Sequence, residues 1–88
     1  MNKTCEHVWT ECIKVIKDNV TMQGFKTWFE PIRPIKLENY ILTIQVPSQF
    51  FYEWLEEHYI DLLKSTIKKE LGKEGRLEYS IVMENSTS

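Results

Sequence analysis

The side chains most able to do chemistry in this sequence are two cysteines and two histidines. Cys5 and Cys12 lie seven residues apart, and on one helix that spacing separates their Cα atoms by about 10 Å, too far for a disulfide. His7 lies between them, but no CxxC or HxxxH spacing of the zinc-binding kind is present. His58 follows two glutamates without forming HExxH, and neither histidine has a Ser or Cys nucleophile in a recognisable arrangement. We therefore expect reduced thiols, no enzyme activity, no metal and no cofactor in this chain.

The stretch GKEG, at residues 72–75, is a candidate phosphate-binding loop. KH domains clamp a nucleic-acid backbone with a GxxG loop, which in those domains joins two helices. Here the loop joins a predicted helix to a predicted strand, and it contributes one acid for its one base. The glycines are therefore interpreted as a helix C-cap and a turn. There is no GxxxxGK[ST] loop, so this chain is not expected to hold ATP phosphates.

Large rings form the other unusual feature, and three of them lie in FKTWFEPIRPI, at residues 25–35. Phe25, Trp28 and Phe29 recur at helical spacing, and the prolines that follow prevent the helix from continuing. Rings spaced in this way usually pin a short helix to a sheet. We predict that these three rings belong mainly to the core.

Trp9 and Phe50 differ from those rings because they fall at or beyond the edge of an apolar arc. Trp9 is expected to be only partly covered by its own domain. Phe50 projects onto the polar side of its predicted helix. For both rings, contact with a partner and burial in the core remain open, since large rings on polar surfaces commonly anchor protein interfaces.

Periodicity and capping residues predict three helices and three strands. Helices are expected over residues 5–19, 22–29 and 49–71, and strands over residues 32–37, 41–46 and 77–83. Thr4, Thr21 and Ser48 are candidate N-caps and Gly72 is a candidate C-cap, while Pro34 marks its strand as an edge or bulged strand. The order helix-helix-strand-strand-helix-strand predicts an α+β fold, with helices packed on a three-stranded sheet.

Length and composition favour one domain. Eighty-eight residues leave no room for a second core, so residues 1–83 are expected to form the domain and the polar residues 84–88 to begin a flexible linker. The N-terminus lacks the apolar run of a signal peptide, and no stretch approaches the ~20 apolar residues of a membrane helix. A cytoplasmic location is therefore expected.

Three stretches, VWTECIKVI, FKTWFEPI and VPSQFFYEWLEEHY, together resemble one family. Their combination, order and spacing are similar to the N-terminal domain (domain I) of the bacterial replication initiator DnaA, over residues 8–83. The resemblance implies a compact KH-like fold and an interaction module rather than a catalyst. Full-length members continue with a linker, an ATPase domain and an origin-binding domain. ATP, Mg²⁺ and origin DNA are thus implied as partners of a longer protein only.

The resemblance also implies specific partners and residues. In the family, this domain self-associates, helps to load the replicative helicase DnaB at the origin and docks regulators of initiation. The self-association surface falls on Trp9 and Ile13. The helicase-contacting Phe falls on Phe50, and a polar residue used by regulators falls on Ser48. An acidic residue implicated in helicase contact is replaced by Gly24, which implies a modified contact.

Two functions are left open by the sequence. The first is a protein-interaction domain of the replication initiator, homo-oligomeric and helicase-binding. The alternative is a weak single-stranded nucleic-acid-binding KH-like module that uses the sheet, the GKEG loop and Lys64, Lys68, Lys69 and Lys73. The first is favoured because 11 basic and 13 acidic residues give a formal charge of −2, whereas phosphate affinity depends mainly on Lys and Arg.

Overall fold

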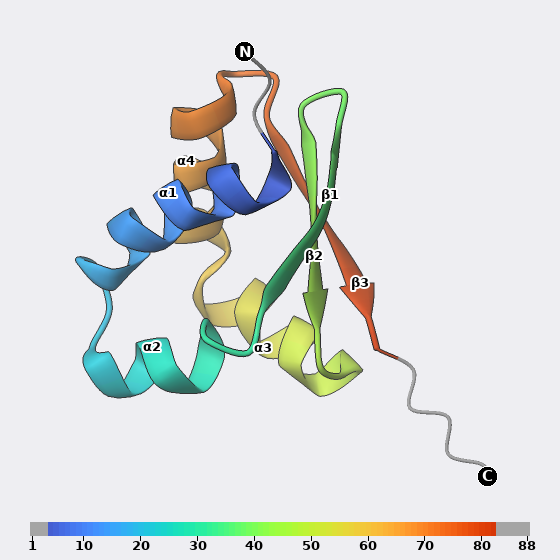
Figure 1. Cartoon of the computed structure of the whole chain (residues 1–88). Helices are drawn as coiled ribbons and strands as arrows, with labels where there is room; N and C mark the ends of the chain where they lie inside the picture. The colour runs from blue at the N-terminus through green and yellow to red at the C-terminus, as the bar shows by residue number, and fades with distance from the viewer. Residues whose placement is uncertain (1–3, 83–88) are drawn as a thin grey trace, which may run out of the picture.

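The computed structural model describes residues 4–82, which form four helices and a three-stranded sheet (Figure 1). The helices are α1 (Cys5–Lys17), α2 (Met22–Trp28), α3 (Gln49–His58) and α4 (Ile60–Leu71), and the strands are β1 (Arg33–Glu38), β2 (Ile41–Val46) and β3 (Arg76–Ile81). The predicted α+β class and three-stranded sheet are confirmed. The expected domain end at residue 83 and the linker over 84–88 lie outside the described residues.

The three predicted N-caps open their helices by the same interaction. In each case the side-chain oxygen accepts a hydrogen bond from the backbone N–H three residues later, which satisfies one of the free donors of the first turn. The pairs are Thr4 with His7 at 3.0 Å, Thr21 with Gly24 at 3.0 Å, and Ser48 with Phe51 at 3.1 Å. Local sequence therefore fixes where α1, α2 and α3 begin.

The sheet has the order β1-β2-β3, so β2 is the central strand. β1 and β2 are antiparallel and are joined by a tight turn in which Asn39 and Tyr40 have φ angles of 52° and 67°, as a two-residue hairpin turn requires. β1 is an edge strand with a register shift between Pro34 and Lys36, which confirms the prediction of an edge or bulged strand at Pro34. β2 and β3 are parallel, with no shift in register, and α3 and α4 make the crossover between them.

The helices lie together on one side of the sheet (Figure 1). α1 packs against α4 and β1, whereas α3 and α4 both contact β3. Leu42, Ile44 and Val46 of the central strand have no exposed surface, as their alternation predicted. The core therefore lies between β2 and the helical layer.

The predicted helix over 49–71 is divided into α3 and α4 at Tyr59, whose φ and ψ are −127° and 9°. Backbone hydrogen bonds continue through the break, since Tyr59 N–H donates to Leu55 C=O at 2.8 Å and Leu63 N–H donates to Tyr59 C=O at 3.0 Å. The Tyr59 ring meets Phe29 edge to face, with ring centroids 5.0 Å apart. No Pro or Gly interrupts this part of the sequence, so the break coincides with packing between distant segments and not with a local helix breaker.

Candidate interaction surface

Phe50 lies in the first turn of α3 and is 67% exposed. The prediction that its ring projects onto the polar side of the helix is confirmed. Ser48, two residues earlier, is half-buried, and its Oγ accepts a hydrogen bond from Phe51 N–H. Ser48 therefore fixes the start of the helix that presents Phe50, whatever it contacts outside the domain.

A row of rings crosses from α2 to α3 beside Phe50. Trp28 stacks on Trp54 with centroids 4.7 Å apart and planes 8° apart. His58 also packs against Trp54, with a centroid distance of 4.0 Å and a tilt of 33°. Trp28 also meets Phe51 at 5.0 Å. These contacts hold the facing sides of α2 and α3 together by ring packing.

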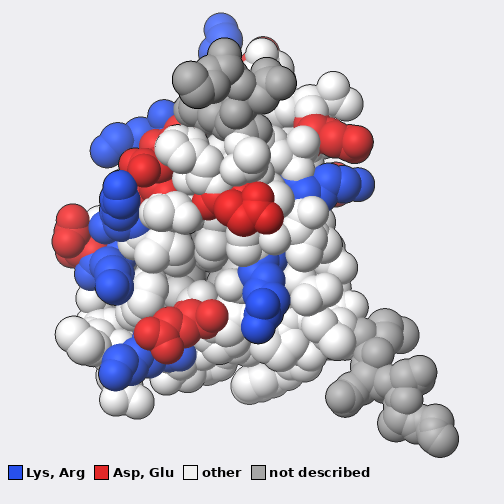
Figure 2. Space-filling view, in the orientation of Figure 1, with Lys and Arg blue, Asp and Glu red and all other residues white. Residues whose placement is uncertain are grey.

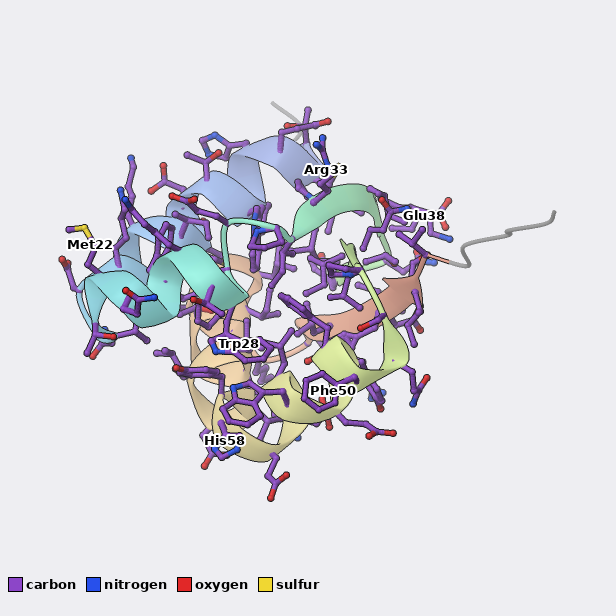
Figure 3. The ribbon with its side chains drawn as sticks, turned by 90° about the horizontal axis from the view of Figure 1, so that it is seen from below. Met22, Trp28, Arg33, Glu38, Phe50 and His58 are labelled. Carbon is purple, nitrogen blue, oxygen red and sulfur yellow. The ribbon has the colours of Figure 1, made fainter. Side chains whose placement is uncertain are left out.

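Figure 3 shows Trp28 of α2 and Phe50 and His58 of α3 close together on the side seen from below, whereas Met22 projects from the other end of α2, away from them. Phe50 and His58 are exposed, and Trp28 and Trp54 are half-buried. We call the surface made by Trp28, Phe50, Trp54 and His58 the α2–α3 face. It combines exposed rings with a rigid helical base.

The sequence reasoning missed most of the α2–α3 face. Phe29 is 1% exposed, as predicted, but Trp28 is only half-buried and belongs to this outer row. Trp54 and His58 lie four residues apart and therefore on one side of a helix. That spacing was a usable signal, whereas their meeting with Trp28 depends on tertiary packing.

Gly24 lies in the first turn of α2 and next to Tyr59. A Cβ atom at this position would come within 3.1 Å of Thr21 Oγ1 and 3.2 Å of Tyr59 Oη. Any side chain at position 24 would therefore need Thr21 Oγ1 and Tyr59 Oη to shift by a few tenths of an ångström. The glycine lets the start of α2 lie close to Tyr59 without that shift.

Trp9 and Ile13 lie on α1, away from Phe50. The expectation that Trp9 would be only partly covered is wrong, because its ring is 5% exposed and belongs to the core. The reason is that α1 packs against both α4 and β1, so its buried surface extends beyond the apolar side that the sequence predicted. Ile13 is half-buried at the edge of the core, and of the two it is the side chain that a partner can reach more easily.

The GKEG turn is structural. Gly72 caps α4 with a φ of 90°, and Gly75 is buried. A Cβ at Gly75 would lie 2.9 Å from Leu71 Cβ and 3.0 Å from Ile67 O. Both glycines are therefore required by the turn itself, which agrees with their interpretation as a C-cap and a turn.

Three of the four lysines proposed for nucleic-acid contact come together. Lys64, Lys68 and Lys73 line a cavity of about 380 Å³ between α4 and β3, whereas Lys69 is outside it. On the face shown in Figure 2, basic and acidic side chains are interspersed, without a broad patch of either sign. The structure thus provides a local basic cavity but no extended basic surface on that face.

The reactive side chains do not assemble a chemical centre in the part of the chain that the structure describes. Burial and the adjacent Glu6 carboxylate raise the pKa of the Cys5 thiol, which disfavours the nucleophilic thiolate. Cys5 and Cys12 are free thiols. Among residues 4–82, no three His, Cys, Asp or Glu side chains are placed to hold a metal ion.

No helix within residues 4–82 combines the length and the apolar character needed to cross a membrane.

Comparison with known proteins identifies the family. Residues 6–69 match the family described as the DnaA N-terminal domain. The chain is 59% identical over 86 residues to the chromosomal replication initiator protein DnaA of Flavobacterium psychrophilum, covering 98% of this chain and 18% of that protein. The corresponding protein of Chlorobaculum tepidum is 48% identical over 81 residues, covering 92% and 16%. That of Thermus thermophilus is 31% identical over 77 residues, covering 88% and 18%.

The chain thus spans less than a fifth of the length of these relatives. The family match covers most of the chain, from α1 through nearly all of α4. It includes the three stretches that carried the resemblance in the sequence. The chain belongs to the DnaA N-terminal domain family.

Proposed function

We propose that this chain is the protein-interaction domain of a chromosomal replication initiator. Its α2–α3 face contacts the replicative helicase DnaB and regulators of initiation, and α1 takes part in self-association through the half-buried Ile13, with the buried Trp9 supporting the helix from the core. The observation that carries the helicase contact is Phe50, a ring that is 67% exposed on a capped helix. A large ring on a rigid base is a favourable interface anchor because little conformational entropy is lost when it binds.

The row of Trp28, Trp54 and His58 supports this proposal. The stacked rings are already in place before any partner binds, and they lie on the same face as Phe50 (Figure 3). A partner can therefore bury Phe50 against a surface that needs no rearrangement. Gly24 sits at the edge of this surface without a charge of its own, so we assign the contact to ring packing rather than to a salt bridge.

The test of the helicase contact is Phe50→Ala, with Tyr40→Ala as the matched control. Tyr40 is also an exposed ring, at 58%, but it lies in the β1–β2 turn at the opposite end of the molecule (Figure 1). Binding to DnaB, measured by titration calorimetry, is expected to weaken about tenfold or more for Phe50→Ala, as for an interface anchor, and to stay unchanged for Tyr40→Ala. Equal binding by the two variants would remove Phe50 from the contact.

The contact of Ser48 with regulators needs a different substitution. Ser48→Ala removes the N-cap of α3 and is expected to cost about 1 kcal/mol, so any loss of binding would combine two effects. Ser48→Asn keeps a capping oxygen but replaces the hydroxyl that a regulator would contact with an amide group. Weaker regulator binding by Ser48→Asn, with unchanged thermal unfolding, supports a direct contact. Wild-type binding by Ser48→Asn argues that Ser48 acts only as a cap.

The remaining functions belong to the longer protein that the relatives' lengths imply. We assign ATP, Mg²⁺ and origin DNA to segments outside this chain, and no catalytic step to the chain itself. A replication initiator works where the chromosome lies, so we place this protein in the cytoplasm.

Single-stranded nucleic acid is the second candidate ligand. The gathering of Lys64, Lys68 and Lys73 around one cavity favours it. Titration with a labelled oligothymidylate at two salt concentrations tests it, because phosphate contacts give binding that weakens steeply with salt. Absence of measurable binding at low salt would dispose of this candidate.

A further inference from the structure

β3 forms one edge of the sheet and has hydrogen-bonding groups that face outward. Arg76 N–H donates to Tyr40 C=O at 2.8 Å, and Val82 N–H donates to Val46 C=O at 3.1 Å, both toward β2. In a parallel ladder, alternate residues turn their N–H and C=O groups to the same neighbour. The alternate residues Leu77, Tyr79 and Ile81 therefore turn their backbone N–H and C=O groups away from β2, to the open edge of the sheet.

The two edges of the sheet differ. β1 carries Pro34, which has no N–H, and a register shift between Pro34 and Lys36. Both features hinder the pairing of another strand. β3 pairs with β2 in an unbroken register over all six of its residues and contains no proline. β3 is thus the edge that is ready to accept a further strand.

A groove runs beside this edge on the helical side of the sheet. It consists of a cavity of about 380 Å³ and an adjoining cavity of about 310 Å³, which share Glu56, Leu77 and Tyr79. Tyr52 of α3 forms part of the far wall, with its ring 4.7 Å from that of Tyr79. A strand added to β3 would therefore point every second side chain into this groove.

The groove has different chemistry at its two ends. Lys64, Lys68, Lys73 and Arg76 line the larger cavity near the start of β3, and none of these four forms an ion pair with another described residue. Glu56 and Glu74 only partly balance them. The smaller cavity, farther along β3, is lined by Tyr52, Leu77, Tyr79 and Ile81 and also by Glu56 and Glu78. Carboxylates suit the first end, whereas uncharged apolar side chains suit the second, where two glutamates disfavour a further carboxylate.

We propose that the β3 edge and this groove bind an extended acidic peptide segment of a partner protein as a fourth strand. The peptide backbone pairs with Leu77, Tyr79 and Ile81, which gives affinity through main-chain hydrogen bonds. Its carboxylates lie beside Lys64 and Lys68, and an apolar side chain lies beside the Tyr52 ring. This surface is separate from the α2–α3 face, so both can be occupied at once.

Two other occupants fit less well. A nucleic acid has no backbone amides or carbonyls to continue the ladder, so it cannot pair with both the N–H and the C=O groups that Leu77, Tyr79 and Ile81 turn outward. A second copy of this chain, paired edge to edge, would turn Leu77, Tyr79 and Ile81 of its own β3 to the groove side, and none of these side chains offers a carboxylate to the four cations. The acidic peptide is the occupant that matches both the strand edge and the charge.

The experiment uses the 88-residue chain and nine-residue peptides with blocked ends. Threonine occupies every odd position of the peptide, and the four even positions carry two glutamates followed by two valines. The reversed sequence covers the other strand direction, and a version with lysine for glutamate is the charge control. Amide chemical shifts and amide hydrogen exchange are measured by NMR. The acidic peptide is expected to shift the β3 signals and to slow exchange of the Leu77, Tyr79 and Ile81 amides by about tenfold or more, since those donors become paired.

Matched variants test the role of charge. Lys64→Glu is expected to weaken binding of the acidic peptide by about tenfold, while Lys69→Glu, the same change on the same helix but outside the groove, leaves it nearly unchanged. Circular dichroism confirms that both variants are folded.

Three outcomes would overturn the proposal. One is that neither acidic peptide slows exchange at the β3 edge. Another is that the lysine peptide or a ten-nucleotide oligothymidylate binds this groove more tightly than the acidic peptides. The third is that concentrated protein alone protects these amides, which would show that a second copy occupies the edge.

Discussion

At the scale of single residues, Tyr79 carries a constraint that links stability to pH. Its Oη is buried close to the Glu56 carboxylate but makes no hydrogen bond of standard geometry among residues 4–82. Burial, and then the negative charge of Glu56, raise the pKa of Tyr79 above its ordinary value of 10.0. The folded protein therefore keeps this proton at a pH where the unfolded chain releases it.

Tyr79→Phe is expected to flatten the alkaline part of the stability profile. Because the folded-state pKa is raised, the stabilisation is fully present below about pH 10 and is lost as the pH rises toward the folded-state value. The Phe variant lacks this loss, and at pH 7 its free energy of unfolding should lie within about 1 kcal/mol of the wild type, since the hydroxyl makes no hydrogen bond of standard geometry. Urea unfolding at pH 7, 9 and 11 measures both effects. Parallel profiles for the two proteins would contradict the assignment.

Trp9 and Phe50 show what a sequence can predict about single side chains. The sequence predicted that each ring lies at or beyond the edge of the apolar side of its helix. This prediction was correct for Phe50, which is 67% exposed. Trp9 is buried because α4 and β1 both reach over α1. A helical projection gives the direction of a side chain, but how far the neighbouring elements extend depends on the tertiary fold.

At the scale of elements, the GKEG turn joins α4 to β3 and sets the register of the parallel strand. Gly72 has φ and ψ of 90° and −177°, a region that is essentially restricted to glycine. Gly75 N–H donates to Gly72 C=O at 2.8 Å, and Arg76 N–H then begins the ladder with β2. The turn therefore leads directly into the β3 edge.

Gly75→Ala and Gly72→Ala are both expected to destabilise the domain, for different reasons. The added methyl at Gly75 meets Ile67 O at 3.0 Å and Leu71 Cβ at 2.9 Å, which should cost about 1–3 kcal/mol through overpacking. At Gly72 there is open space, and the cost of about 1–3 kcal/mol comes from backbone strain. Chemical denaturation measures both, with Lys73→Ala as the exposed control within about 0.5 kcal/mol of the wild type. A Gly75→Ala variant as stable as that control would show that the close packing is wrong.

The elements also show where sequence reasoning stopped. Caps and periodicity placed α1, α2, β1 and β2 to within one or two residues at nearly every end, because those signals are local. The division between α3 and α4 had no local signal. At this division Tyr59 packs against Phe29, thirty positions earlier, and a contact of that range cannot be read from the spacing of residues along one helix.

At the scale of the whole molecule, all helices lie on one side of the sheet, and the three possible contact surfaces are the α2–α3 face, the β3 groove and α1. α3 contributes Phe50, Trp54 and His58 to the α2–α3 face and Tyr52 and Glu56 to the β3 groove. α1 lies elsewhere in the helical layer, against α4 and β1. Self-association through α1 would therefore leave the other two surfaces free, and it can be tested by itself.

Ile13→Ala is the informative variant for self-association, and Trp9→Ala is not. Trp9 is 5% exposed in the core, so its truncation should cost about 3–5 kcal/mol, a large fraction of the stability of a domain of this size. Lower association of Trp9→Ala would then report unfolding. Ile13 is half-buried, and its truncation is expected to weaken association severalfold, as for an interface side chain, while the domain stays folded.

Sedimentation velocity over a range of concentrations measures this association, with circular dichroism as the check on folding. His7→Ala, an exposed position in the first turn of the same helix, serves as the control and should associate like the wild type. If Ile13→Ala also associates like the wild type, α1 is not the contact. If the wild type remains monomeric at every concentration, this domain does not self-associate, and any oligomer of the longer protein must be held together by its other segments.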